Sequence, residues 1–497
     1  MRTALEPVVT PVAMGRIDRR AIDSGIVGYR LMLMAGAAIA ASVLRHYGDA
    51  AGVDVLCGPG NNGGDGYVAA KMLQTSGMCA ACYSLGDPVK LAGDAACARD
   101  DWGDEILSLE DYVPTDGRVV IDALFGAGLQ RDVEGVAVRV IEAVNAFDIP
   151  VIAADLPSGL SGESGRVRGT ALRASRTVTF AAPKPGHFLL PGRDLCGVLE
   201  IADIGIPSRC IEAETEGLWL NRPPLWRDAL PRLAANSHKY TRGHLGVFSG
   251  GYRQTGAARL AAIAGLRVGA GLVTVLSPAS ANAANAAHLT TIMLRTIDGG
   301  ADLDGLLEDM RFNSFVLGPG FGVGEKARDF AERILGAGRA LVLDADGITS
   351  FAGYHDQLAE AAAKQDAILF ITPHQGEFAR LFPQIASNAS RSKVEQARSA
   401  ARETEAIVVY KGADTVVADP SGRAAICDNA PPWLATAGSG DTLAGLLGGL
   451  AAQGMPGFEA ACAAAWLHGE AANRAGARLI AEDLANNLPA FSEFQEY

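Results

Sequence analysis

Short apolar runs alternate with longer stretches of helical periodicity along the first half of the chain. Residues 53–58, 118–128 and 150–159 each form an apolar run that ends in a polar or glycine-rich turn, whereas residues 16–47 and 134–147 have a helical pattern. Strands that alternate with helices predict a mostly parallel, doubly wound sheet, and ligands of such sheets bind at the carboxyl ends of the strands. The three polar turns, near residues 58, 122 and 155, are therefore expected to meet in one crevice.

The same alternation restarts after a stretch that contains three prolines. We interpret residues 218–236 as a linker between a domain at residues 1–217 and a second domain at residues 237–497. Residues 405–427 alternate like a hairpin around a DPSG turn, and the alanine- and glycine-rich residues 442–453 and 458–475 predict closely packed helices. The expected fold class is α/β, with a Rossmann-like three-layer domain first.

Composition limits the possible partners. The 497 residues are 49% apolar and 20% charged, and the net charge of −13 argues against nucleic acid and anionic membranes as partners. The first residues lack a signal-peptide pattern, and the apolar run at residues 31–41 is too short to cross a bilayer. We expect a cytoplasmic protein without a membrane partner.

Eight cysteines are scattered along the chain. Cys79 and Cys82 form a single C-x-x-C pair, which lacks the second pair that a zinc site needs and lies in a strand-like segment. We interpret this pair as coincidental and expect no disulfide framework.

Two glycine-rich segments are the most informative motifs. Residues 58–66 read GPGNNGGDG, residues 437–445 read AGSGDTLAG, and each opens a helical pattern, where backbone N–H groups can hold phosphate. Each also contains one aspartate, Asp65 and Asp441, although such a loop repels a carboxylate. Two of these loops indicate two nucleotide-handling sites.

The second segment predicts phosphoryl-transfer chemistry. Thr436, Gly438, Ser439 and Gly440 can form a nest of N–H donors, which would place Asp441 beside the transferring group as a general base. A helix-capping role for Asp441 is the structural alternative.

The surrounding motifs resemble a known superfamily. GSGD at residues 438–441 and KGADTVV at residues 411–417 are similar to the ribokinase-like superfamily, whose T-P-N-x-x-E motif corresponds to TPHQGE at residues 372–377. The histidine in place of asparagine, together with GPGFG at residues 318–322, resembles the ADP-dependent NAD(P)H-hydrate dehydratases. The match covers about residue 237 to the C-terminus and implies a ribokinase-like α/β domain.

This resemblance implies a reaction and its residues. Hydrated NADH or NADPH would be dehydrated with ADP as co-substrate, giving AMP and phosphate, through phosphorylation of the ring hydroxyl and loss of phosphate. Asp441 would be the base, Mg2+ would assist phosphoryl transfer, and the hydrate would contact Ala257, Gly322, His374 and Asp441. The residues implied to hold the adenine nucleotide are Lys411, Gly412, Ala413, Asp414, Thr415 and Gly440.

Other polar residues of this half have two interpretations. Asp344 and Asp346 follow a strand and are as compatible with a turn as with a phosphate or metal site. Glu377 would either hold water on magnesium or cap a helix. His238 and His244 are expected at the surface.

In the first half, two aspartates follow strands. Asp122 precedes a flexible loop that contains Arg131, and Asp155 precedes Pro-Ser-Gly. Asp155 is a candidate acid/base group, with an Asx turn as the structural alternative.

Residues 10–215 resemble the NAD(P)H-hydrate epimerase domain, apart from Val27 where a proline is expected. The resemblance implies a K+ site at Asn62, Asp122 and Ser158, and makes Asp155 the group that interconverts the two hydrate epimers. The implied substrate contacts are Asn61, Asn62, Gly63, Gly64, Asp65, Gly126, Ala127, Gly128, Leu129, Gln130, Arg131, Asp132 and Asp155.

The predicted function is therefore repair of hydrated NADH and NADPH by a bifunctional enzyme, which we expect to be a homo-oligomer with small-molecule substrates. One alternative is a ribokinase-like kinase fused to a nucleotide-binding module, and it would need ATP and a free alcohol. A second alternative is a nucleotide sensor without catalysis. Sequence alone leaves the preference for ADP over ATP to family analogy.

Overall fold

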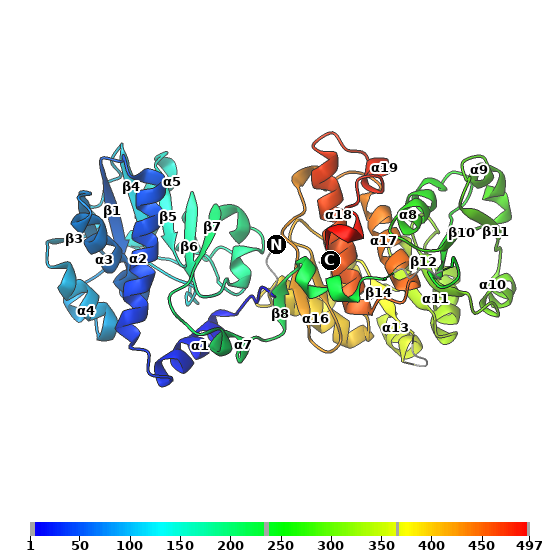
Figure 1. Cartoon of the computed structure of the whole chain (residues 1–497), viewed down its shortest axis with the longest axis horizontal. Coiled ribbons are helices and arrows are strands. Elements are labelled where there is room, and N and C mark those ends of the chain that lie inside the picture. The colour runs from blue at the N-terminus through cyan, green and yellow to red at the C-terminus, as the bar shows by residue number, and fades with distance from the viewer. Residues whose placement is uncertain (1–4, 233–237, 364–366, 495–497) are drawn as a thin grey trace. The chain divides into compact units, whose positions relative to one another are not determined.

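The structure is a computed structural model that describes residues 5–232, 238–363 and 367–494. The chain divides into two compact units, Pro7–Leu218 and Trp219–Tyr497, and the segment up to Glu6 belongs with the second (Figure 1). Within the expected linker, strand β8 (Leu218–Leu220) joins the sheet of the second unit. Residues 233–236 of that linker, and residue 237 where the second domain is expected to begin, lie outside the described residues.

A parallel sheet of seven strands forms the centre of the first unit. Its order is β3-β2-β1-β4-β5-β6-β7, so the chain builds outward from β1 in one direction and from β4 in the other. This reversal is the switch point at which doubly wound sheets bind ligands. The bounds are β1 (Gly52–Cys57), β2 (Ala80–Ser84), β3 (Ile106–Ser108), β4 (Arg118–Ala123), β5 (Val151–Ala154), β6 (Arg176–Phe180) and β7 (Val198–Ala202).

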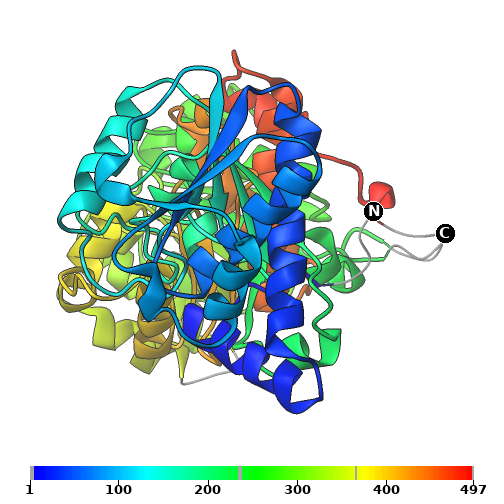
Figure 2. The same ribbon diagram turned by 90° about the vertical axis from the view of Figure 1, so that its left-hand side faces the viewer.

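Helices cover both faces of this sheet (Figure 2). Val55 and Ile121 pack with helices α1, α2 and α3, whereas their neighbours Leu56 and Val120 pack with α5, because successive side chains of a strand point to opposite faces. The expected three-layer α/β architecture is confirmed. The helices are α1 (Pro11–Asp23), α2 (Gly28–Tyr47), α3 (Asn61–Thr75), α4 (Gly93–Trp102), α5 (Val136–Ala146), α6 (Gly192–Leu195) and α7 (Ser208–Glu212).

The predicted helical stretch at residues 16–47 is two helices and not one. Gly25 has a φ of 100° and separates α1 from α2. The sequence pattern missed this break because the apolar periodicity resumes within a few residues. Helix α1 also begins earlier than predicted, where Thr10 caps it by accepting a hydrogen bond from the backbone of Ala13.

The second unit contains a ten-stranded sheet in the order β11-β10-β9-β12-β13-β14-β15-β16-β17-β8. Pairs from β11 to β15 are parallel, and β15, β16 and β17 are antiparallel, which confirms the predicted hairpin around DPSG. The bounds are β9 (His244–Phe248), β10 (Leu272–Ser277), β11 (Met293–Thr296), β12 (Phe312–Leu317), β13 (Ala340–Leu343), β14 (Leu369–Ile371), β15 (Ile407–Tyr410), β16 (Val416–Ala418) and β17 (Ala424–Ile426).

Two groups of helices sandwich this second sheet (Figure 1). Helices α8, α17 and α18 share a core with Val247, Val316 and Val342, and α11, α13 and α16 pack on the other face. None of the described helices is long and apolar enough to cross a membrane. The helices are α8 (Gly256–Arg267), α9 (Asn282–Ala286), α10 (Gly300–Leu307), α11 (Glu325–Gly336), α12 (Asp346–Ser350), α13 (His355–Ala362), α14 (Gln375–Leu381), α15 (Pro383–Ala386), α16 (Lys393–Thr404), α17 (Ser439–Ala452), α18 (Gly457–Ala475) and α19 (Ala481–Leu484).

His244 corrects one expectation. It lies in β9 and is buried, and its ring stacks on Phe312 with 3.7 Å between ring centroids. Its Nε2 is 2.7 Å from Thr274 Oγ1. Every residue of β9 is buried, including His244 at its start, so the histidine belongs to the core and not to the surface.

Glycines allow α8 and α17 to approach each other closely. A Cβ at Gly445 would lie 2.1 Å from the backbone oxygen of Ala261, and one at Gly449 would lie 2.6 Å from that of Gly265. This close contact confirms the prediction of tight packing from the glycine and alanine content.

We expect Gly445→Ala to lower the free energy of unfolding by about 1–3 kcal/mol, because an added methyl group would force the two helices apart. Gly305→Ala is the matched control: Gly305 is exposed in α10 with no atom within 4 Å of an added Cβ. Helix propensity predicts a gain of roughly 0.5–1 kcal/mol there. Urea denaturation measures both, and equal effects of the two substitutions would contradict this account of the packing.

Candidate functional site

The loops at the carboxyl ends of β1, β4, β5 and β6 meet in the first unit. Cys57 lies opposite Ala123 in the sheet, so the loops after β1 and β4 start at the same level. A Cβ at Gly126 would lie 3.2 Å from both Asn62 Oδ1 and Asp155 Oδ2. The structure therefore brings together residues from three of the predicted segments.

Asp155 is the centre of a polar network. Its Oδ1 accepts hydrogen bonds from Lys184 Nζ at 2.6 Å and from Thr179 Oγ1 at 3.0 Å, and its Oδ2 accepts one from the backbone of Ala127 at 3.0 Å. Its φ of 65° is unusual for a residue other than glycine, and such conformations persist where surrounding contacts hold them. Asp155 is thus held rigidly at the end of β5.

This network keeps Asp155 ionised. Burial alone would raise the pKa of its carboxyl, but the charge and hydrogen bond of Lys184 lower the pKa to about 2. His187 donates from Nε2 to the backbone oxygen of Asp155 at 2.7 Å, because its Nδ1 accepts from the backbone N–H of Lys184. Burial and Lys184 lower the pKa of His187 to about 4, so the imidazole is neutral.

Asp122 is fully buried beside Ser158. Ser158 donates to Asp122 from its hydroxyl at 2.6 Å and from its backbone N–H at 2.7 Å. Burial raises the pKa of Asp122 to about 6, against these hydrogen bonds. The partners of this carboxylate within the described residues are uncharged. Asp122 and Ser158, two of the three predicted K+ ligands, are thus adjacent.

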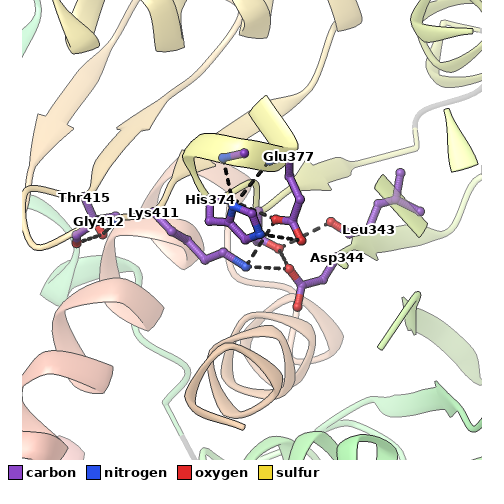
Figure 3. A network of polar contacts seen from close by, with 9 residues as sticks. Leu343, Asp344, His374, Glu377, Lys411, Gly412 and Thr415 are labelled. Atoms are coloured by element: carbon purple, nitrogen blue, oxygen red, sulfur yellow. Dashed lines mark hydrogen bonds and ion pairs between the residues drawn. The ribbon is translucent and has the colours of Figure 1, made fainter. Parts of the chain in front are cut away.

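In the second unit, the ends of β13, β14 and β15 hold a second polar network (Figure 3). Asp344 Oδ1 accepts from Lys411 Nζ and from Thr372 Oγ1, each at 2.7 Å. Asp344 is 2% exposed, and its backbone oxygen accepts a turn hydrogen bond from Gly347 while its carboxylate pairs with Lys411. Burial lowers the pKa of Lys411, but Asp344 and Glu377 outweigh this and raise it, so the lysine is charged.

His374 and Glu377 cap the start of α14 (Figure 3). His374 Nδ1 accepts from the backbone N–H of Gly376 at 2.9 Å, and Glu377 Oε2 accepts from the backbone N–H of His374 at 2.9 Å. The imidazole Nε2 is 3.4 Å from Glu377 Oε1, and the His374 side chain is 54% exposed. Glu377 thus has the capping role, and it also lies 3.9 Å from Lys411 Nζ.

Helix α17 begins beside this network. A Cβ at Gly440 would lie 3.6 Å from Lys411 Nζ and 3.9 Å from Asp344 Oδ2. Gly438 precedes the helix with a φ of 85°, the left-handed conformation that opens the turn. Burial and the charge of Asp344 raise the pKa of Asp441 to about 6, partly offset by Lys411.

Further predicted residues of the second unit lie in the first turn of a helix or in loops. Ala257 is half-buried in the first turn of α8, and exposed Gly322 donates its backbone N–H to Asp346 Oδ2 at 3.0 Å. Gly412 and Thr415 form a turn in which Thr415 Oγ1 donates to Gly412 O at 2.7 Å. Asp414 is buried and accepts from Lys393 Nζ at 2.5 Å, so its side chain stabilises this loop.

A separate hollow of about 530 Å³ lies at the amino ends of β1 and β4, lined by Arg45, Asp49, Arg118 and Asp148 among others. Ligands of doubly wound sheets bind at the opposite, carboxyl ends of the strands. We assign this hollow no part in the chemistry. Within the described ranges, no group of three or more histidine, cysteine, aspartate or glutamate side chains could hold a metal ion.

Sequence comparisons match both units. Residues 28–186 match the family model described as YjeF-related protein N-terminus, and residues 245–491 match the one described as NAD(P)H-hydrate dehydratase. A bifunctional NAD(P)H-hydrate repair enzyme from Moorella thermoacetica is 35% identical over 97% of this chain and 96% of its own length. The chain belongs to the family of bifunctional NAD(P)H-hydrate repair enzymes.

Further relatives of the same name agree with this assignment. The Coxiella burnetii protein is 35% identical over 95% of this chain and 96% of its own length, and the Escherichia coli protein is 32% identical over 95% and 91%. A solved ADP/ATP-dependent NAD(P)H-hydrate dehydratase from Bacillus subtilis is 25% identical and covers 56% of this chain and 98% of its own, with a TM-score of 0.49. The assignment rests on the sequence matches.

Sequence reasoning missed several residues that the site contains. Lys184, Thr179 and His187 surround Asp155, and Thr372 donates to Asp344, the partner of Lys411. Thr179 lies in β6, and Lys184, His187 and Thr372 follow the carboxyl ends of β6 and β14. That position was the available signal, but it does not say which side chain pairs with which.

Proposed function

We propose that the chain repairs hydrated NADH and NADPH in two steps, one in each unit. The first unit would interconvert the R and S hydrates, and the second would use ADP to dehydrate the S hydrate, giving the reduced dinucleotide, AMP and phosphate. The observation that carries this proposal is the match over 97% of the chain to a bifunctional NAD(P)H-hydrate repair enzyme.

In the first step, the ionised carboxylate of Asp155 makes the site suited to a positively charged intermediate. Addition of water across an enamine double bond leaves a hydroxyl group on the carbon next to the ring nitrogen. Loss of that hydroxyl gives a cationic ring, and attack by water on either face gives either epimer. The ionised carboxylate of Asp155, held by Lys184 at 2.6 Å, would stabilise this positive charge.

In the second step, hydroxide is a poor leaving group, so phosphorylation of the hydroxyl precedes its loss. The N–H groups at the start of α17 and the charge of Lys411 would hold the phosphates. Asp441 would take the proton from the substrate hydroxyl, with Ala257, Gly322 and His374 around the nicotinamide ring. The residues from Lys411 to Thr415, with Gly440, would contact the adenine nucleotide.

Magnesium fits the second unit. Mg2+ is usually bound by one or two carboxylates together with substrate phosphates and water. Asp344 and Glu377 offer two buried carboxylates, and both lie within 4 Å of Lys411 Nζ. When bound, Mg2+ would neutralise charge on the transferring phosphoryl group.

Potassium fits the first unit. Asp122 supplies one buried negative charge, Ser158 Oγ lies 2.6 Å from it, and the backbone oxygen of Phe125 lies 3.3 Å from the same hydroxyl. The side chain of Asn62 could supply its amide oxygen, which lies 3.2 Å from the position of a Cβ at Gly126, in the loop that also contains Phe125. Oxygens of this kind replace the hydration shell of K+.

The two activities should separate by mutation. We expect Asp441→Asn to lower the rate of ADP-dependent dehydration by ~10²–10⁴-fold, because the general base is lost, while epimerisation continues. Asp155→Asn should do the reverse. Chromatography resolves the R and S hydrates, and the near-ultraviolet absorbance of reduced nicotinamide follows dehydration. Each variant is the control for the other, and loss of both activities in either folded variant would contradict the division of labour.

The dehydration step should depend on the ionisation of Asp441. Its pKa is raised to about 6, and the base acts only when ionised. We expect kcat/KM to be constant above pH 7 and to fall about tenfold per pH unit below pH 6. A pH profile of dehydration starting from pure S hydrate measures this, and a constant rate from pH 5 to pH 8 would exclude Asp441 as the base. The kinase alternative instead predicts turnover of ATP with a free alcohol.

Potassium should stabilise the first unit. We expect the thermal midpoint and the epimerisation rate to rise when tetramethylammonium chloride is replaced by potassium chloride at equal ionic strength, since a bound cation stabilises the folded state. Asp122→Asn should abolish both effects. Asp116→Asn, which changes an exposed carboxylate, should keep them. An unchanged midpoint in the wild type would exclude the cation site.

A further inference from the structure

The epimerase site has an excess of acidic groups. Asp18 of α1 and Asp65 of α3 both lie within electrostatic range of Asp155 and Lys184, and of each other. His187, the other ionisable group of this network, is neutral. With every carboxyl ionised, three negative charges would share the single positive charge of Lys184. The site is therefore not neutral unless acidic groups retain protons.

Asp65 is the least compensated of these acids. It is 9% exposed, and among the described residues only burial and charges, with no hydrogen bond, act on its carboxyl group. The charges that act on it are Asp155, Asp18 and Lys184; helices α2 and α4, which also pack against α3, contribute none among the described residues. Lys184 Nζ donates its hydrogen bonds to Asp155 and Thr179, and none to Asp65.

The chain at the start of α1, the helix that contains Asp18, packs against the loops of the site. The backbone N–H of Val9 donates to Pro183 O at 2.9 Å, next to Lys184. Pro11 Cγ would lie 2.8 Å from a Cβ at Gly162, in the segment after Asp155. Asp18 is half-buried on this helix, which lies before the residues matched by the family model.

Electrostatics decide which acid holds a proton. A buried carboxyl group without a cationic partner or a hydrogen bond favours its neutral form. Burial raises the pKa of Asp65 well above its usual range, and the charges of Asp155 and Asp18 raise it further. Burial also raises the pKa of Asp18, to about 6. Lys184 keeps Asp155 ionised. The two environments therefore favour the ionised form of Asp155 and the protonated form of Asp65.

We propose that Asp65 is the proton donor of the epimerase and that Asp18 is the positioning residue that keeps the proton on Asp65. This inference rests on the proposed epimerisation and deepens it. Asp155 is then the anion that stabilises the cationic ring, and it is not the acid.

The step balances without any further reactant. Asp65 gives its proton to the hydroxyl oxygen as the C–O bond breaks, and the lone pair of the ring nitrogen forms a C=N bond. Water leaves, and the ring carries one positive charge beside Asp155. Water then attacks the other face: a C–O bond forms, the C=N electrons return to nitrogen, and the released proton returns to Asp65. The net change is inversion at one carbon.

The test is the pH profile of epimerisation, with the full-length chain and separated R and S hydrates. We expect wild-type activity to fall on the alkaline side, where Asp65 loses its proton. Asp65→Asn should lower kcat by ~10²–10⁴-fold and remove this alkaline limb. Asp18→Asn should keep most of kcat but shift the limb to lower pH, because the negative charge that raises the pKa of Asp65 is gone. Asp23→Asn, which changes an exposed aspartate at the end of the same helix, should leave the profile unchanged.

Thermal denaturation gives a second measurement. An acid whose pKa is raised by folding destabilises the protein as pH increases above the unfolded pKa. The thermal midpoint of Asp65→Asn should therefore rise relative to wild type as pH increases. Wild-type rate and an unchanged alkaline limb in Asp65→Asn, or no shift in Asp18→Asn, would overturn the inference. Absence of epimerisation in the wild type would instead overturn the proposed function.

Discussion

An ion pair between a lysine and a carboxylate, with one of the two partners buried, is the interaction on which each site depends. Lys184 holds Asp155 in the first unit, and Lys411 holds Asp344 in the second, with nitrogen–oxygen distances of 2.6 and 2.7 Å. In both units the pair joins loops from the carboxyl ends of different parallel strands. Removal of one partner would leave an uncompensated buried charge, so the pair ties the electrostatics of each site to the packing of its sheet.

Both pairs also assign protonation states to their neighbours. In the first unit, Lys184 keeps Asp155 ionised, and because it is bound to Asp155 and Thr179 it does not neutralise Asp65 and Asp18 as well. In the second unit, Asp344 raises the pKa of Asp441 and Lys411 limits the increase. Acids within electrostatic range of the same lysine therefore differ in ionisation. This difference is what an enzyme needs in order to have an anion and a proton carrier in one site.

Close backbone approaches make these sites possible. A Cβ at Gly58 would lie 1.7 Å from Leu124 O, and one at Gly318 would lie 1.8 Å from Asp344 O. Each glycine allows the loop that follows one strand to contact the loop that follows its neighbour. The glycine-rich segments therefore serve the contact between strands as well as any contact with phosphate, and a sequence motif does not distinguish the two roles.

The sequence by itself determined the alternation of strands and helices, the parallel sheets and the positions of the polar loops, because these follow from local periodicity and glycine content. It also marked Asp155 and Asp441 through motifs at strand and helix ends. Only the tertiary structure decided which groups pair: Lys184 is 29 residues from Asp155, and Lys411 is 67 residues from Asp344. The same holds for Asp18, which α1 carries to the site, and for His244, which the sheet buries. Charge interactions and burial depend on distance in space, so partners and protonation states cannot be read from the order of residues along the chain.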